Sequence, residues 1–147
     1  MSQEDGSVTL PFADGEYTFR IAIGQWRELQ EQINRTRLAM GAPVIGPSEL
    51  ARLLMSVNAW PDDVREVIRL GLIGGGLKSD RALVLIKRHV EGQPFLVNTL
   101  LAAKIVHAAI YGPPDDEVGK EPPPPQPETA TETDASGLAN STGLVLQ

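Results

Sequence analysis

The chain of 147 residues contains no cysteine and only two histidines. The absence of cysteine excludes a disulfide framework, thiolate metal sites and a cysteine nucleophile, and it is typical of proteins in a reducing cytosol. No apolar run reaches the 18 residues that predict a membrane span, and acidic residues stand where a signal peptide would be basic and then apolar. We therefore expect neither a membrane protein nor a secreted one.

Excess charge is missing from most of the chain and is concentrated at one end. Residues 1–112 carry 12 Lys and Arg against 12 Asp and Glu, whereas residues 113–147 carry Lys120 against seven acids. A nucleic-acid-binding protein clusters basic residues on one face, and a neutral body offers no such excess. Nucleic acid is therefore not an expected partner.

Residues 113–147 also lack aromatic residues and hold seven of the twelve prolines, four of them consecutive. This composition predicts a disordered, acidic, proline-rich tail, so we place a domain boundary after residue 112. Three adjacent apolar residues, Leu144, Val145 and Leu146, interrupt the polar tail. They are interpreted either as an ordinary chain end or as a short docking peptide on a tether.

Alternating apolar residues predict a β-hairpin at the start of the body. They are Val8, Leu10 and Phe12 before Asp14-Gly15, and Tyr17, Phe19, Ile21 and Ile23 after it. An Asp-Gly pair between two such runs is a strong hairpin signal. Pro11 has no amide hydrogen to donate, so the first strand is expected at an edge.

Helical periodicity then predicts five helices. They cover about residues 25–39, a segment from Pro47 with Val57 on its core face, residues 62–73, a segment from a Ser79 cap to Val90, and residues 95–111. On the first helix we expect Arg27, Glu28, Glu31, Arg35 and Arg37 to form a solvated charged strip. The last helix is apolar almost all round, so we expect it to be central and buried on most sides. The predicted fold class is mainly α (α+β), with a hairpin followed by a small bundle of about five helices.

The segment from Gly71 to Ser79 is similar to a phosphate-binding loop but departs from that motif. Leu77 separates the last glycine from Lys78, and a helical pattern precedes the loop where the motif needs a strand. We interpret the glycines as a helix end, with Gly74 or Gly75 at positive φ and Ser79 capping the next helix. Nucleotide binding through this loop remains the weakest alternative.

The sequence offers no catalytic or metal-binding constellation. His89 and His107 stand 18 residues apart on different predicted helices, without a neighbouring zinc-ligand pattern. No serine or carboxylate is placed beside either histidine by a motif. We therefore expect no catalytic residue, no metal and no cofactor, and we predict that the protein is not an enzyme.

The order of elements resembles a phage family. The resemblance rests on the segments TLPFADGEYTFRIAIG and VREVIRLGLIGGG, a helix that starts with serine and ends in HVEGQPF, and an alanine-rich apolar last helix. Over residues 7–112 the chain looks like the gene-transfer-agent and siphophage tail assembly chaperone family, one branch of which carries a tail tube label. That resemblance implies a non-enzymatic protein of the bacterial cytoplasm that coats the tape measure protein and recruits tail tube subunits. Some relatives make a longer form by translational frameshifting.

The leading hypothesis is therefore a tail assembly chaperone, with the tape measure protein and the tail tube protein as partners and self-association possible. The alternative is a structural tail component, either a tube or a completion subunit. Apolar area left open by the hairpin and the first helix is the expected contact surface, because a two-stranded sheet keeps an open edge. Arg27 and Glu31 are expected on the solvent side of the first helix, beside that edge.

Overall fold

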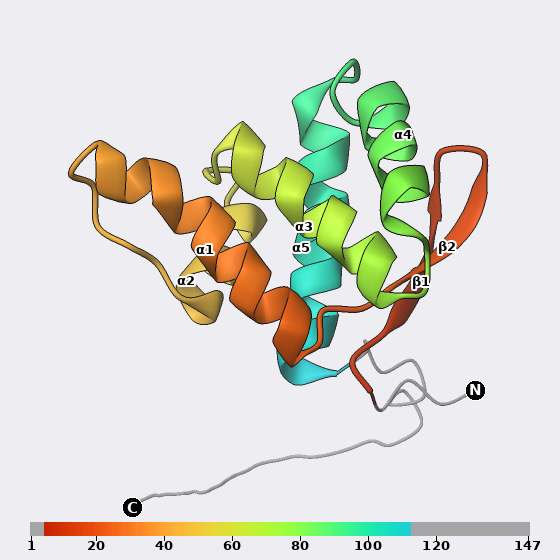
Figure 1. Cartoon of the computed structure of the whole chain (residues 1–147), viewed down its shortest axis with the longest axis horizontal. Coiled ribbons are helices and arrows are strands. Elements are labelled where there is room, and N and C mark those ends of the chain that lie inside the picture. The colour runs from red at the N-terminus through yellow and green to blue at the C-terminus, as the bar shows by residue number, and fades with distance from the viewer. Residues whose placement is uncertain (1–4, 113–147) are drawn as a thin grey trace, which may run out of the picture. The chain divides into compact units, whose positions relative to one another are not determined.

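In the computed structural model, residues 5–112 are described. The elements are β1 (Val8–Phe12), β2 (Gly15–Phe19), α1 (Ile23–Ala39), α2 (Pro47–Met55), α3 (Pro61–Gly74), α4 (Ser79–His89) and α5 (Phe95–Tyr111) (Figure 1). A hairpin followed by five helices confirms the predicted fold class. None of these helices is long and apolar enough to cross a membrane. The predicted tail, with Leu144, Val145 and Leu146, lies outside the described residues.

The hairpin turns one residue earlier than the Asp-Gly pair predicts. Phe12 pairs with Gly15, so Ala13 and Asp14 are the two turn residues. Ala13 has a φ of 56°, a left-handed conformation that favours glycine. β2 ends at Phe19, and Ile23 begins α1. The alternation of apolar residues therefore continues through Ile21 and Ile23, although the strand itself has already ended.

The end of the hairpin lies directly on the last turns of α3. The backbone N–H of Arg20 donates to the carbonyl of Gly71 at 2.9 Å. A Cβ atom at Gly74 would lie 1.9 Å from the Arg20 carbonyl oxygen, and one at Gly75 would lie 1.9 Å from the Thr18 carbonyl oxygen. Glycine is required at both positions because the two backbones cross at this distance.

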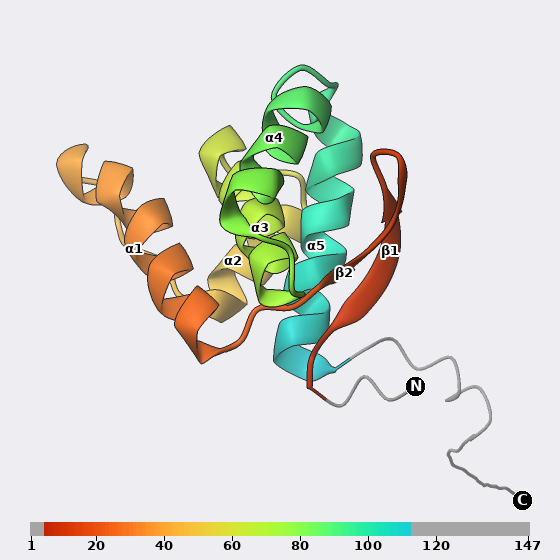
Figure 2. The same ribbon diagram turned by 45° about the vertical axis from the view of Figure 1, so that its right-hand side comes forward.

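The central helix is α3, not α5. Helix α3 contacts α1, α4, α5 and β2, and both views place α1 on one side of it and the hairpin on the other (Figures 1 and 2). Its buried residues are Asp63, Val64, Glu66, Val67, Ile68, Leu70, Gly71 and Leu72. Helix α5 packs on α2 and α3 but keeps large apolar side chains in solvent. The expectation that α5 is buried on most sides is therefore wrong, since composition does not reveal how many neighbours a helix has.

A buried ion pair joins α1 to the start of α3. The two terminal guanidinium nitrogens of Arg37 donate to the carboxylate of Asp63, at 2.9 and 2.6 Å, and the guanidinium carbon lies 4.3 Å from the ring centroid of Trp60. Arg37 also donates to the Ile33 carbonyl, and Asp63 accepts from the Trp60 backbone N–H. Arg37 is only 3% exposed, so its expected place on the solvated strip is wrong.

Three local predictions at helix ends are also wrong. Helix α2 ends at Met55, and Val57 follows it with a φ of 58° instead of continuing the core face. Helix α4 begins at Ser79, and Lys78 before it forms no side-chain cap. The positive φ of the glycine segment falls on Gly76, at 112°, and not on Gly74 or Gly75.

Candidate functional site

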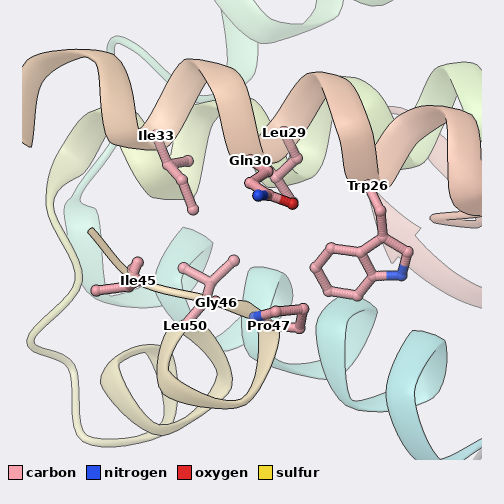
Figure 3. A pocket seen from close by; sticks show the side chains of 8 residues that line it. All are labelled: Trp26, Leu29, Gln30, Ile33, Ile45, Gly46, Pro47 and Leu50. Carbon is pink, nitrogen blue, oxygen red and sulfur yellow. The ribbon is translucent and has the colours of Figure 1, made fainter. Parts of the chain in front are cut away.

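The space between α1 and the start of α2 is a packed interface. Trp26, Leu29 and Ile33 point from α1 toward Ile45, Pro47 and Leu50, and Figure 3 shows the two sets of side chains facing each other. The enclosed volume is about 10 Å³. That volume holds at most one water molecule. This interface orders α1 against α2 but has no room for a ligand.

An open hollow on the outer side of α1 contains both predicted partner residues of the body. Arg27 and Glu31 are exposed and line it with Leu38 and Val44, and its volume is about 540 Å³. Leu38 is 67% exposed and Val44 55%. The hollow therefore combines apolar side chains with charges of both signs, which suits a protein segment better than a small molecule.

A second hollow lies between the hairpin turn and the start of α5. Pro11, Phe12 and Ala13 line one part of it, and Val97 and Leu101 of α5 line another; its volume is about 440 Å³. No hairpin residue lines the α1 hollow, and neither Arg27 nor Glu31 lines this one. We expected the hairpin and the Arg27–Glu31 side of α1 to form one surface, but they line two separate hollows.

The exposed edge of β1 is a poor template for a further strand. Pro11 occupies the fourth of its five residues and has no N–H to donate. The strand is short, and natural proteins use short strands and proline to limit edge pairing. A helix filling the adjacent hollow is therefore favoured over strand addition.

A short hydrogen bond holds the hairpin turn. The Tyr17 hydroxyl donates to the Asp14 carboxylate at 2.6 Å. This bond lowers the pKa of Asp14 below its ordinary value and raises the pKa of Tyr17 above its own. The bond fixes the turn at the rim of the second hollow.

Both histidines pack against aromatic rings. His89 meets Phe12 edge-on with centroids 6.2 Å apart, and His107 lies 4.8 Å from the ring of Tyr111. Within the described residues no three metal-binding side chains gather. Packing therefore accounts for the position of each histidine without a ligand.

The glycine segment has a structural role. It follows helix α3, whereas a phosphate-binding loop follows a strand. Gly74 and Gly75 lie against the hairpin backbone, so that packing accounts for two of the three consecutive glycines. Lys78 is exposed at the start of α4.

These features define a small, mainly helical protein whose open hollows suit protein partners. The sequence model of a family described as "Phage tail tube protein, GTA-gp10" matches residues 5–112. The chain belongs to this family of phage tail proteins, as the sequence resemblance indicated. Searches of curated proteins and of solved structures found no match.

Proposed function

We propose that this protein is a non-enzymatic tail assembly chaperone that binds the tape measure protein and recruits tail tube subunits in the bacterial host cytoplasm. The observation that carries the proposal is a helical body with open, partly apolar hollows on different elements. One lies on α1 around Leu38, and the other lies between the hairpin turn and α5. Exposed apolar patches on a small protein mark sites of protein interaction.

Two separate hollows suit the two tasks of such a chaperone. The α1 hollow and the hairpin–α5 hollow share no lining residue, so two partners can be held at once. Holding two partners on one chain raises the effective concentration of each for the other. Recruitment of tube subunits to a bound tape measure protein needs this arrangement.

A structural tail subunit is the second candidate, and the family description as a tail tube protein favours it. A tube lumen lined by sheet needs several strands from each subunit, and the described residues contain one two-stranded sheet. A completion subunit at the end of the tail needs no such sheet. The two candidates differ in whether the protein stays in the finished particle.

The test is co-expression of the tape measure protein with and without this chain, followed by measurement of its soluble fraction. A chaperone raises the soluble fraction and co-purifies with the tape measure protein. Mass spectrometry of purified particles supplies the second readout, and a chaperone is absent from them. Stoichiometric amounts in the particle, with no effect on tape measure solubility, would establish the structural role instead.

A further inference from the structure

One face of helix α5 is mostly open, with five exposed residues and two, Ala103 and His107, that are half-buried. At 100° per residue, seven residues fall within an arc of about 120°. They are Leu96, Val97, Leu100, Ala103, Lys104, His107 and Tyr111, and we call them the α5 stripe. Leu96 is 53% exposed, Val97 68% and Leu100 46%. The opposite face is buried and includes Thr99, Ala102 and Val106.

The composition of the α5 stripe is that of a face that becomes buried. A helix face that remains in water is mainly polar, whereas an apolar stripe of this width normally faces a core. Lys104 is its only Lys, Arg, Asp or Glu. Leu96, Leu100, Ala103 and His107 follow one another at intervals of four, three and four residues, which is the spacing of a coiled-coil seam. We propose that the α5 stripe is a docking face for an amphipathic helix of another protein.

Lys104 favours a different protein over a second copy of this chain. It lies at the middle of the stripe, which runs from residue 96 to residue 111. Lys104 flanks the seam, so an antiparallel pair of α5 helices centred on the stripe places it near its own counterpart. A parallel pair gives Lys104 no acidic residue to meet, because the stripe contains no Asp or Glu. Burying two like charges together is unfavourable, whereas a carboxylate on the partner helix neutralises Lys104. The occupant is therefore a helix with an apolar seam and an acidic residue opposite Lys104.

The stripe is continuous with the hollow at the hairpin turn. Val97 belongs to the stripe and also lines that hollow with Pro11 and Phe12. A helix lying along α5 therefore reaches the hollow at one end, where a large apolar side chain fits. This assignment rests on the proposed function, because it identifies the surface that receives a helix of the tape measure protein.

The test uses the full chain co-expressed with the tape measure protein. Leu100→Glu places a charge in the seam, and Met55→Glu is the matched control because Met55 is an exposed apolar residue on α2 (63%). We expect Leu100→Glu to reduce co-purified tape measure protein at least tenfold and Met55→Glu to leave it unchanged. Circular dichroism and melting confirm that each variant is folded, and Leu100→Gln serves as a milder variant.

A second variant tests the charge. Lys104→Glu weakens binding, and replacing the partner's acidic seam residue by lysine restores it. Equal binding by all variants overturns the α5 assignment while leaving the proposed function intact. Failure of the wild-type chain to bind overturns the proposed function itself and the assignment with it. A wild-type dimer that Leu100→Glu converts to a monomer, seen by sedimentation, identifies a second copy as the occupant and also overturns the assignment.

Discussion

Arg37 and Asp63, 26 residues apart in the sequence, are joined by two hydrogen bonds. The pair is shielded from water, because the two side chains are only 4% and 1% exposed. Breaking a buried ion pair on one side leaves an uncompensated charge and typically costs about 3–5 kcal/mol. Replacing both partners by apolar residues removes that penalty. The pair is therefore a sensitive probe of the α1–α3 junction.

We predict that Arg37→Met lowers the free energy of unfolding by about 3 kcal/mol, measured by urea denaturation. The double variant Arg37→Met/Asp63→Leu recovers most of the loss and retains a deficit of about 1 kcal/mol, because Asp63 also accepts the Trp60 N–H at the start of α3. The control is Arg52→Met, which breaks an exposed pair with Glu49 and should change stability far less, because solvent screens an exposed pair. Equal losses for the two single variants would contradict the role of burial.

Gly75→Ala tests the crossing of the hairpin over α3. The added Cβ would lie 1.9 Å from the Thr18 carbonyl oxygen, so one backbone must move. We expect a loss of about 3 kcal/mol or more, seen as a lower melting temperature. Gly24→Ala is the control, because nothing lies within 4 Å of a Cβ added at this second residue of α1, so stability should stay the same or rise slightly. A Gly75→Ala protein as stable as the wild type would show that the crossing is looser than described.

Two residues in left-handed conformations offer stabilising substitutions. Val57 has a φ of 58° just after α2, and a β-branched residue is rarely found there. Val57→Gly should raise the free energy of unfolding by about 1 kcal/mol, and Ala13→Gly by a similar or smaller amount. Val84→Gly, at an exposed position inside α4, should lower stability by about 0.5 kcal/mol, because glycine is a poorer helix former than valine. Chemical denaturation of the three variants measures whether the free energy of unfolding rises or falls in each. A loss of stability in Val57→Gly would argue against backbone strain at Val57.

The hairpin turn gives a pH dependence. Because the Tyr17 hydroxyl lowers the pKa of Asp14, the bond contributes stability above the carboxyl's ordinary pKa, and this contribution is lost as the pH falls through the lowered value. Tyr17→Phe should return the pKa of Asp14 toward its ordinary value, measured by NMR titration. The stability difference between wild type and Tyr17→Phe should be largest at neutral pH and shrink on acidification. A difference that stays constant would point to lost packing of the ring instead.

The α1 hollow provides a test that is separate from α5. Reversing both charges, with Arg27→Glu and Glu31→Arg, should weaken association with a tail partner several-fold, because both residues line the hollow beside Leu38. The fold should be unaffected, since both side chains are exposed. The matched control exchanges the exposed Glu49 and Arg52 on α2. Unchanged binding to both the tape measure and tube proteins would remove the α1 hollow from the candidate surfaces.

Local sequence patterns predicted the elements because each pattern is set by neighbours in the chain. The strand alternation and the helical spacing of Leu29 and Ile33 needed no tertiary information. The burial of Arg37 depends on Asp63, and the need for glycine at position 75 depends on the carbonyl of Thr18. No local pattern contains such pairs of distant residues.

The candidate surfaces were predicted less well for the same reason. Arg27 and Glu31 were placed correctly in solvent by their spacing, but their distance from the hairpin depends on how α1 and β2 pack around α3. The open face of α5 could not be predicted from a sequence that is apolar almost all round. Only the packed arrangement shows which of its apolar residues lack a neighbour.

The crossing of Thr18 over Gly75 also sets an order of events during translation. The hairpin is synthesised first, but its docking site on α3 leaves the ribosome more than fifty residues later. At about 5–20 residues per second this delay lasts several seconds. A lone two-stranded hairpin is only marginally stable in water, so the nascent chain carries Phe12 and Phe19 without their final cover throughout that interval. Synthesis of α3 is therefore required before the end of β2 can dock, and the cover of Phe12 also needs His89 of α4.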